Sequence, residues 1–224
     1  MKQHSKLLLV FPALLLLAAC GNQPGHGTGL QAIRGAVLKK AAPSSAIPDA
    51  TELKRTITEA LANTDKRLAV AVVERHNTFT FLTEIARNGA YSTWGSPDRR
   101  TLSEQSGLVT ASRGLGADLM SANVGESLAL IQGQRAGSAI RSHIYLDGEN
   151  QEVSLIFSCS FAPTGQQTIS IGEIHVTTRT VEERCAGHGL SFQNNYRVSS
   201  TGRIVQSRQW IGPKIGHITI QKLR

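Results

Sequence analysis

The chain has 224 residues, of which 40% are apolar and 18% are charged, and its formal net charge is +8. This composition excludes an intrinsically disordered chain, and the length suits about one domain with a sizeable core. The positive charge favours anionic partners such as lipid head groups, lipopolysaccharide phosphates or acidic polysaccharides, although a basic surface can also serve solubility alone.

The N-terminus has the pattern of an export signal. Lys2 and Lys6 precede an apolar run over residues 7–17, which is too short to cross a membrane as a helix. The run ends in Leu17-Ala18-Ala19-Cys20, which resembles a lipobox. This resemblance implies a signal peptide over residues 1–19, diacylglycerol on the Cys20 sulfur and acylation of its new amine. The alternative is a secreted protein with a chance cysteine at the cleavage point.

A lipidated Cys20 makes the membrane the first expected partner, because two or more acyl chains anchor a protein stably. Gly21 after the cysteine, in place of Asp, favours the outer membrane, with the protein facing the periplasm. Loss of the two signal lysines lowers the formal charge to +6. Nucleic acid is not an expected partner in this compartment.

Residues 20–48 are rich in Gly, Pro, Ala and Ser, which predicts a flexible tether. A tether of this length reaches on the order of 30 Å and would hold a domain over residues 49–224 off the bilayer. The domain begins with a predicted helix. Asp49 can cap it, Glu52 follows as in a capping box, and Leu53, Ile57 and Leu61 form one apolar stripe.

After this helix the apolar residues recur with a period of two, which indicates strands. The segments 68–73 and 78–86 are the first, and Asn88-Gly89 is a strong hairpin signal before 90–95. Further strands are predicted at the segments 141–146, 153–161, 168–180, 192–198, 204–211 and 217–223. The turns between them are predicted at Asp147-Gly148, Thr164-Gly165 and Thr201-Gly202.

Strands that recur every 10 to 14 residues without intervening helices predict an antiparallel meander. The fold class is therefore all-β with short helices. A large sheet must hide one face, so we expect it to curl around the N-terminal helix, with the irregular segment 114–125 as a second filler.

Cys159 and Cys185 remain once Cys20 is lipidated, and an even pair in an oxidising compartment favours a disulfide. The closed loop of 27 residues would contribute about 3.5 kcal/mol by loop entropy. A metal site formed with His175 and His188 is the alternative, but only Cys185 and His188 have ligand-like spacing. We expect neither a metal nor another cofactor.

Catalytic patterns are weak. The segment 125–129 around Ser127 resembles a nucleophile elbow whose last glycine is Ala129, but the α/β context of that motif is missing. No two histidines are spaced four residues apart, and no pair of carboxylates stands out. We expect no enzyme and no catalytic residue, and keep a periplasmic hydrolase using Ser127 as an alternative.

Three residues are candidate contacts to a glycan or a protein partner. Trp94 and Trp210 can stack on sugar rings, although a tryptophan on a sheet more often packs in the core. Arg208 belongs to the basic C-terminal stretch 203–224, which contains no acid. This stretch either faces an anion or pairs with acids elsewhere, such as Glu182 and Glu183.

Two further patterns resemble the YjbF/GfcB family of capsule and exopolysaccharide lipoproteins. The first is an N-x-Y strand, a Gly turn and an S-x-Q-aromatic strand, here Asn194-Asn195-Tyr196, Gly202, Ser207-Arg208-Gln209-Trp210 and Gly212. The second is Trp94, Gly107-Leu108-Val109 and Gly114-Leu115-Gly116-Ala117-Asp118-Leu119. Val109, Arg113 and Arg197 depart from the family pattern.

The resemblance covers residues 49–224 and the lipobox. It implies a large meander sheet similar to the half-barrels of lipoprotein carriers, and a non-enzymatic accessory role in exopolysaccharide or capsule assembly and export. It also implies partners among the envelope proteins of polysaccharide export, an anionic polysaccharide, and a second copy of the chain in a homodimer. The alternative function is a periplasmic carrier of lipid or lipoprotein, with a cavity lined by Phe79, Phe81, Phe157 and Phe161.

Overall fold

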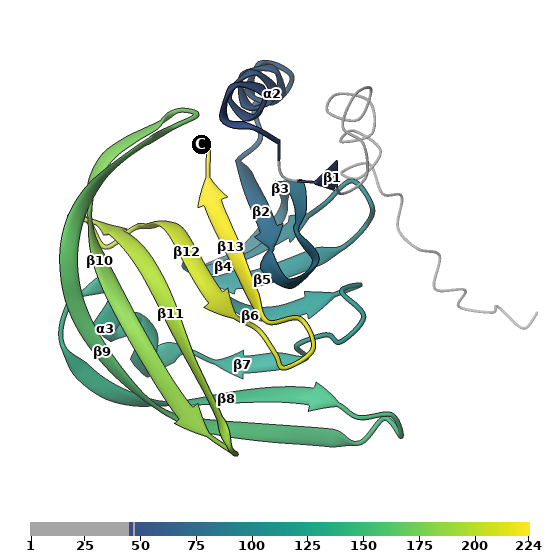
Figure 1. The fold of residues 1–224 in the computed structure, drawn as a ribbon, viewed down its shortest axis with the longest axis vertical. Helices are drawn as coiled ribbons and strands as arrows, with labels where there is room; N and C mark the ends of the chain where they lie inside the picture. The colour runs from purple at the N-terminus through teal and green to yellow at the C-terminus, as the bar shows by residue number, and fades with distance from the viewer. Residues whose placement is uncertain (1–44, 47) are drawn as a thin grey trace, which may run out of the picture.

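The computed structural model describes residues 45–46 and 48–224 (Figure 1). The predicted signal peptide, Cys20 and most of the predicted tether lie outside the described residues. Within the described part of the chain, no helix is both long and apolar enough to cross a membrane.

The domain consists of strands with two α-helices and one short 3-10 helix. The helices are α2 (Ala50–Ala62), η1 (Glu74–His76) and α3 (Gly125–Gln132). The strands are β1 (Ser45–Ala46), β2 (Leu68–Val73), β3 (Thr78–Asn88), β4 (Tyr91–Gly95), β5 (Thr101–Gln105), β6 (Leu108–Arg113), β7 (Ser121–Asn123), β8 (Gly137–Leu146), β9 (Glu152–Ile171), β10 (Ile174–Gly187), β11 (Leu190–Ser199), β12 (Ile204–Trp210) and β13 (His217–Lys222).

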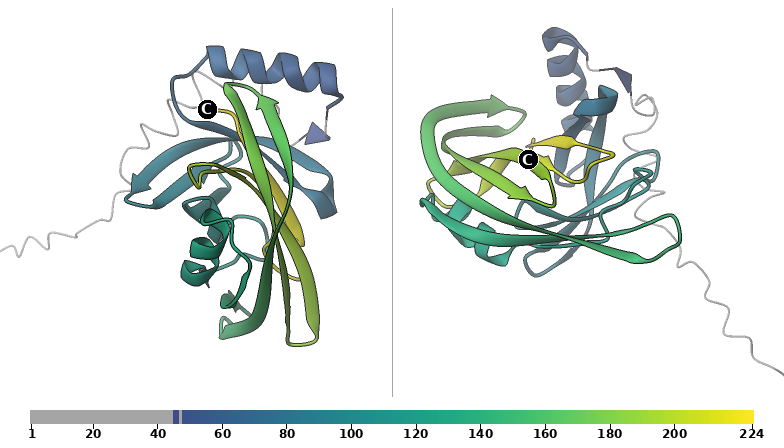
Figure 2. Two further views of the ribbon diagram at one scale, coloured as in Figure 1. Left: turned by 90° about the vertical axis from the view of Figure 1, so that its left-hand side faces the viewer. Right: turned by 60° about the horizontal axis from the view of Figure 1, so that its bottom comes forward.

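All strands join one antiparallel sheet in the order β6-β5-β4-β3-β2-β13-β12-β11-β10-β9-β8-β7, and β1 pairs with β3. The predicted antiparallel meander is confirmed. The sheet curls until its two ends meet (Figures 1 and 2). At the junction Leu119 O accepts from Ser112 N on β6, and Met120 N donates to Ile144 O on β8. These bonds nearly close the sheet into a barrel.

The two faces of β2 separate the interior from the outside, because neighbouring side chains of a strand point to opposite faces. Ala69 and Ala71 belong to an apolar cluster with Ile218 and Ile220, on what we call the inner face. Leu68 and Val70 belong to a different cluster, which includes Ile57 of α2. The helix therefore packs on the outer face, which corrects the expectation that the sheet curls around it.

The interior is filled instead by side chains from the predicted second filler, segment 114–125, and from α3, which follows it. Leu119 packs in the inner cluster of β2 and β13, whereas Leu128 and Ile131 of α3 pack against Phe157 and Tyr196. Asp118 shapes the loop before Leu119, because its carboxylate accepts from the backbone N–H groups of Gly114 and Leu115.

The helix start and most turns agree with the predictions. Asp49 accepts hydrogen bonds from Thr51 N and Glu52 N and caps α2, whose buried Ile57 belongs to the predicted stripe. The hairpins at Gly89, Gly148 and Gly202 also form where expected.

The predicted turn at Thr164-Gly165 is wrong. β9 runs through both residues to Ile171, and the chain reverses at Gly172, whose φ is +60°. The pairing with β10 shifts here, since Pro163 faces Val181 whereas Gln166 faces Arg179. A β-bulge thus accommodates the residues that signal a turn. β8 no longer pairs with β9 beyond Phe161. Pro163 therefore lies where one edge of β9 has no neighbouring strand of the described chain to bond, which is where a strand tolerates proline.

Candidate functional site

One end of the curled sheet holds a hollow of about 290 Å³, which we call the basic cavity. Its walls come from β3, β4, β5 and β13, the turn between β11 and β12, α3 and the C-terminus. Five basic side chains line it, namely Arg67, Arg87, Arg203, Lys222 and Arg224. Glu104 is the acidic residue among the lining groups.

Lys222, Glu104 and Trp94 form the floor of the basic cavity. Lys222 follows Ile218 and Ile220 on the inner face of β13, so the strand period buries its ammonium group. Lys222 Nζ donates to Glu104 Oε2 at 2.6 Å and lies 3.9 Å from the centre of the Trp94 ring. Burial lowers the pKa of Lys222, and the charge of Glu104 opposes that effect.

Guanidinium groups form the rim. Arg67 and Arg87 lie 3.8 and 2.6 Å from the carboxylate of Glu84, and Arg224 lies 2.6 Å from that of Glu173. Arg203 has no ion-pair partner among residues 48–224, and its pKa is lowered by partial burial and by the like charge of Arg67. The rim therefore keeps positive charge that no acid of the described chain neutralises.

Two polar atoms of the floor lack a hydrogen-bond partner among the residues that the structure describes. They are the indole Nε1 of Trp94 and the Oε1 of Glu104, and the two residues are 3% and 2% exposed. The indole N–H of Trp94 can only donate a hydrogen bond. The ionised carboxylate of Glu104 can only accept one. A buried polar atom without a partner is unfavourable, so this floor suits a ligand with both an acceptor and a donor.

A second buried polar group lies deeper, on β8, β10 and β11. Arg141 Nη1 donates to both oxygens of Glu183, at 3.2 and 3.0 Å. Asn194 and Tyr196 donate to Glu183 Oε2 at 2.7 and 2.6 Å. Burial, together with the Glu183 charge, raises the pKa of Tyr196. We call this set the Glu183 network.

His143 lies beside this network in an aromatic cluster. Its ring stacks on Trp210 with 5.7 Å between centres, and Trp210 stacks on Phe192 at 4.4 Å. Burial, and then the nearby charge of Arg141, lowers the pKa of His143 to about 3. The imidazole is therefore neutral at physiological pH and serves packing.

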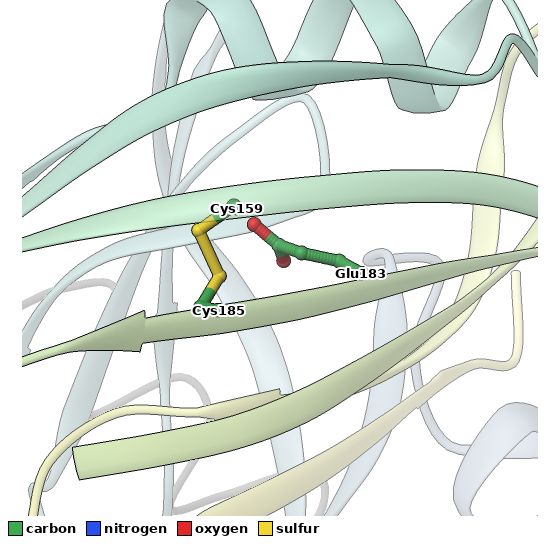
Figure 3. Close-up of side chains that lie close together, drawn as sticks. All are labelled: Cys159, Glu183 and Cys185. Atoms are coloured by element: carbon green, nitrogen blue, oxygen red, sulfur yellow. A yellow bond between two sulfur atoms is a disulfide. The ribbon is translucent and has the colours of Figure 1, made fainter.

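Cys159 and Cys185 form a disulfide between directly paired positions of β9 and β10, beside Glu183 (Figure 3). The alternative metal set is not brought together. His175 lies near the far end of β10 and contacts Ser170, whereas the ring of His188 contacts Phe157. The cysteine sulfurs and Glu183 lie close to one another, but the carboxylate is already bonded to Arg141, Asn194 and Tyr196.

The structure places both candidate tryptophans in the core, the more common position named above for a tryptophan on a sheet. Trp94 and Trp210 are 3% and 8% exposed. The ring face of Trp94 is covered by Lys222, and that of Trp210 by Phe192. Trp94 nevertheless lines the basic cavity, and its indole Nε1 has no hydrogen-bond partner among the described residues.

Arg208 lies on the outer face in a two-point ion pair with Glu74, with N–O distances of 2.8 and 2.7 Å. Its Nη1 also donates to Gln193 O. Three basic residues of the C-terminal stretch thus pair with acids elsewhere, which is one of the two alternatives that the sequence left open, but these acids are Glu74, Glu104 and Glu173, not Glu182 and Glu183. Arg203 and Lys214 of this stretch have no ion-pair partner among residues 48–224.

Two other expectations can be placed. Ser127 lies inside α3 and is 1% exposed, so its Oγ does not stand at an accessible turn as an elbow requires. The four phenylalanines do not share a cavity. Phe79 and Phe81 pack under α2 on the outer face, whereas Phe157 and Phe161 pack in the interior.

A larger hollow of about 890 Å³ lies over β8 to β11. Small polar side chains contribute much of its lining, including Ser138, Ser158, Ser160 and Ser191. Its charged lining residues are one base, Arg184, and one acid, Glu126. This hollow therefore has no excess of one charge, unlike the basic cavity.

Sequence reasoning identified Trp94 but missed Glu104, Arg67, Arg87 and the exceptional position of Arg203. The strands β5 and β6 that carry or border Glu104 were not predicted either. The available signal was Lys222, a charged residue in phase with Ile218 and Ile220, because a buried lysine requires a buried acid nearby.

The fold places the chain in the class of antiparallel β proteins whose single sheet curls into a nearly closed barrel. Within that class the chain belongs to the YjbF family, described as group 4 capsule polysaccharide lipoprotein GfcB/YjbF, whose family model matches residues 39–223. The resemblance found in the sequence is confirmed. No curated protein matches the sequence.

Among solved structures, the lipoprotein YmcC from Escherichia coli matches with a TM-score of 0.66 and 18% identity, over 79% of this chain and 90% of YmcC. This likeness shows the fold. An exported protein with a YmcC-like fold from Bacteroides fragilis matches with a TM-score of 0.29 and 8% identity, over 71% of this chain and 93% of that protein.

Proposed function

We propose that this protein is a non-enzymatic lipoprotein of the outer membrane that assists the assembly or export of a capsule polysaccharide from the periplasmic side. The observation that carries the proposal is membership of the YjbF family over residues 39–223. Its expected partners are the membrane, the envelope proteins of polysaccharide export, the polysaccharide and a second copy of the chain.

The anchor is inferred from the sequence. Lys2, Lys6, the apolar run 7–17 and Cys20 give an export signal followed by an acylation site. Stable anchoring by acyl chains would keep the domain at the surface where the polymer passes.

The non-enzymatic role is supported by how the candidate groups are used. Ser127 is enclosed in α3, His143 is buried in an aromatic cluster, and Glu183 is bonded by three side chains. None of these groups is placed for general acid–base or nucleophilic work, which needs an accessible reacting atom.

Deletion of the gene in the source bacterium tests the role. We expect the amount of surface polysaccharide to fall, and the wild-type chain to restore it. Ser127→Ala should restore it equally, because no group within residues 48–224 bonds to the Ser127 Oγ. Normal polysaccharide in the deletion strain would overturn the proposal, and failure of Ser127→Ala with normal protein levels would overturn its non-enzymatic part.

Cys20→Ala tests the anchor separately. We expect palmitate labelling of the wild-type protein and its recovery with outer membranes, and loss of both in the variant. Recovery of unlabelled wild-type protein in a soluble fraction would contradict the anchor.

A further inference from the structure

We propose that the basic cavity binds an acidic sugar unit, meaning a sugar that carries a carboxylate or a phosphate. This inference rests on the proposed function and names the class of ligand that the protein recognises. The shared chemistry is a negative group joined to hydroxyl groups within one ring.

The charge of the cavity calls for the negative group. Five basic side chains line it against one lining carboxylate, that of Glu104. Glu84 and Glu173 neutralise part of the rim from outside, but Arg203 has no acidic partner in the described chain. Arg203 and Arg67 also repel each other, and an anion between them would relieve that repulsion.

The floor calls for the hydroxyl groups. Trp94 Nε1 needs an acceptor, and Glu104 Oε1 needs a donor. A sugar hydroxyl or ring oxygen satisfies the first, and a hydroxyl hydrogen satisfies the second. Inorganic phosphate as a dianion, or a carboxylate alone, offers Glu104 only repulsion, so a bare anion fits half of the site.

The geometry of the Trp94 contact differs from the usual stacking of a sugar on an indole face. Lys222 occupies that face at 3.9 Å and is held there by Glu104. The ligand would therefore meet the indole edge. The size agrees, because a hollow of about 290 Å³ lies at the small end of ligand sites and suits one sugar unit, not a lipid chain.

Calorimetric titration of the full protein, purified from membranes in detergent, tests the inference. The probes are a disaccharide containing glucuronate, glucose 1-phosphate, glucose and inorganic phosphate. We expect either or both acidic sugars to bind at least about tenfold more tightly than glucose or phosphate, since both halves of the site are then used. Which of the two binds identifies the source of the charge.

Two variants separate the two halves of the site. Arg203→Gln should weaken binding of the acidic sugar about tenfold or more and leave glucose unchanged. Trp94→Phe removes the indole N–H and should weaken the same ligand by several-fold to tenfold. Arg184→Gln is the matched control, because its side chain is 69% exposed and lies outside the cavity lining. It should bind as the wild type does.

Several results would overturn the inference. They are equal binding of glucose and acidic sugar, tightest binding of phosphate, no binding of either acidic sugar, or unchanged affinity in a folded Arg203→Gln protein. If the deletion strain loses its polysaccharide while no acidic sugar binds, this inference fails and the proposed function stands. If acidic sugars bind as expected while the deletion strain is normal, the proposed function fails instead.

Discussion

Two ion pairs are buried on the inner face of the same sheet, Arg141 with Glu183 and Lys222 with Glu104. In the first pair both carboxylate oxygens of Glu183 accept hydrogen bonds, and Asn194 and Tyr196 supply further donors. In the second, Glu104 Oε1 accepts no hydrogen bond from the described residues, and Trp94 Nε1, whose ring also contacts Lys222, donates none to them. The first carboxylate is enclosed by aromatic and aliphatic packing, whereas the second lines a cavity.

The two ion pairs therefore differ in role. The buried charges of Arg141 and Glu183 stabilise the fold, whereas Glu104 keeps an oxygen that a ligand can bond. A buried charge is tolerated when its partners satisfy it, and removal of a partner is then strongly unfavourable. A carboxylate left with an unused oxygen at a cavity wall retains capacity for a ligand. Arg141 Nε is unbonded too, but in a packed interior, so it offers no route to a ligand.

The largest effect is expected from Glu183→Gln. This change keeps the side-chain shape but leaves the Arg141 guanidinium buried without a negative partner, which should lower the free energy of unfolding by about 3–5 kcal/mol. Urea denaturation measures it. Glu59→Gln on the exposed face of α2 is the control and should change stability by less than about 1 kcal/mol. Similar small effects at both positions would contradict the structural role of the Arg141–Glu183 pair.

The Cys159–Cys185 disulfide beside Glu183 should give the next effect. Replacing both cysteines by alanine removes the constraint on a 27-residue loop and so increases the conformational entropy of the unfolded chain. The free energy of unfolding should fall by about 3.5 kcal/mol. Urea denaturation of the wild type with a reductant should show the same loss. An unchanged midpoint under reduction would contradict this prediction.

His143 makes the Glu183 side of the sheet sensitive to acid. Its pKa is about 3 in the folded protein against an ordinary 6.5, so the unfolded chain binds the proton first. The stabilising contribution is complete above pH 6.5 and is lost as the pH falls toward 3. His143→Phe should remove about 2 kcal/mol of the stability difference between pH 6.5 and pH 5. Parallel acid dependence in the two proteins would refute it.

Arg203→Gln should have the smallest effect on stability, less than about 0.5 kcal/mol, because the side chain is at most partly buried and lacks an acidic partner among the described residues. The same variant should lose affinity for an acidic sugar. Urea denaturation beside the calorimetric titration distinguishes the two properties. A large loss of stability would place Arg203 on the structural side of the comparison.

The sequence by itself determined the elements that depend on neighbours along the chain. The cap at Asp49, the hairpin after Asn88 and the alternation along β11 follow from local spacing, and they lead to an antiparallel meander. The turn expected at Thr164-Gly165 failed because pairing with β10, through a bulge, outweighed the local signal.

Only the tertiary structure decided which face the helix covers and which residues meet at the basic cavity. Trp94, Glu104, Arg203 and Lys222 come from four separate segments, and each alone reads as an ordinary strand or turn residue. The curl of the sheet brings them to one end, and curvature depends on twist, bulges and packing summed over many strands. The curvature that results leaves no short-range pattern in the sequence. The charge of a buried lysine therefore indicates that an acidic partner exists, but the sequence does not identify which acid it is.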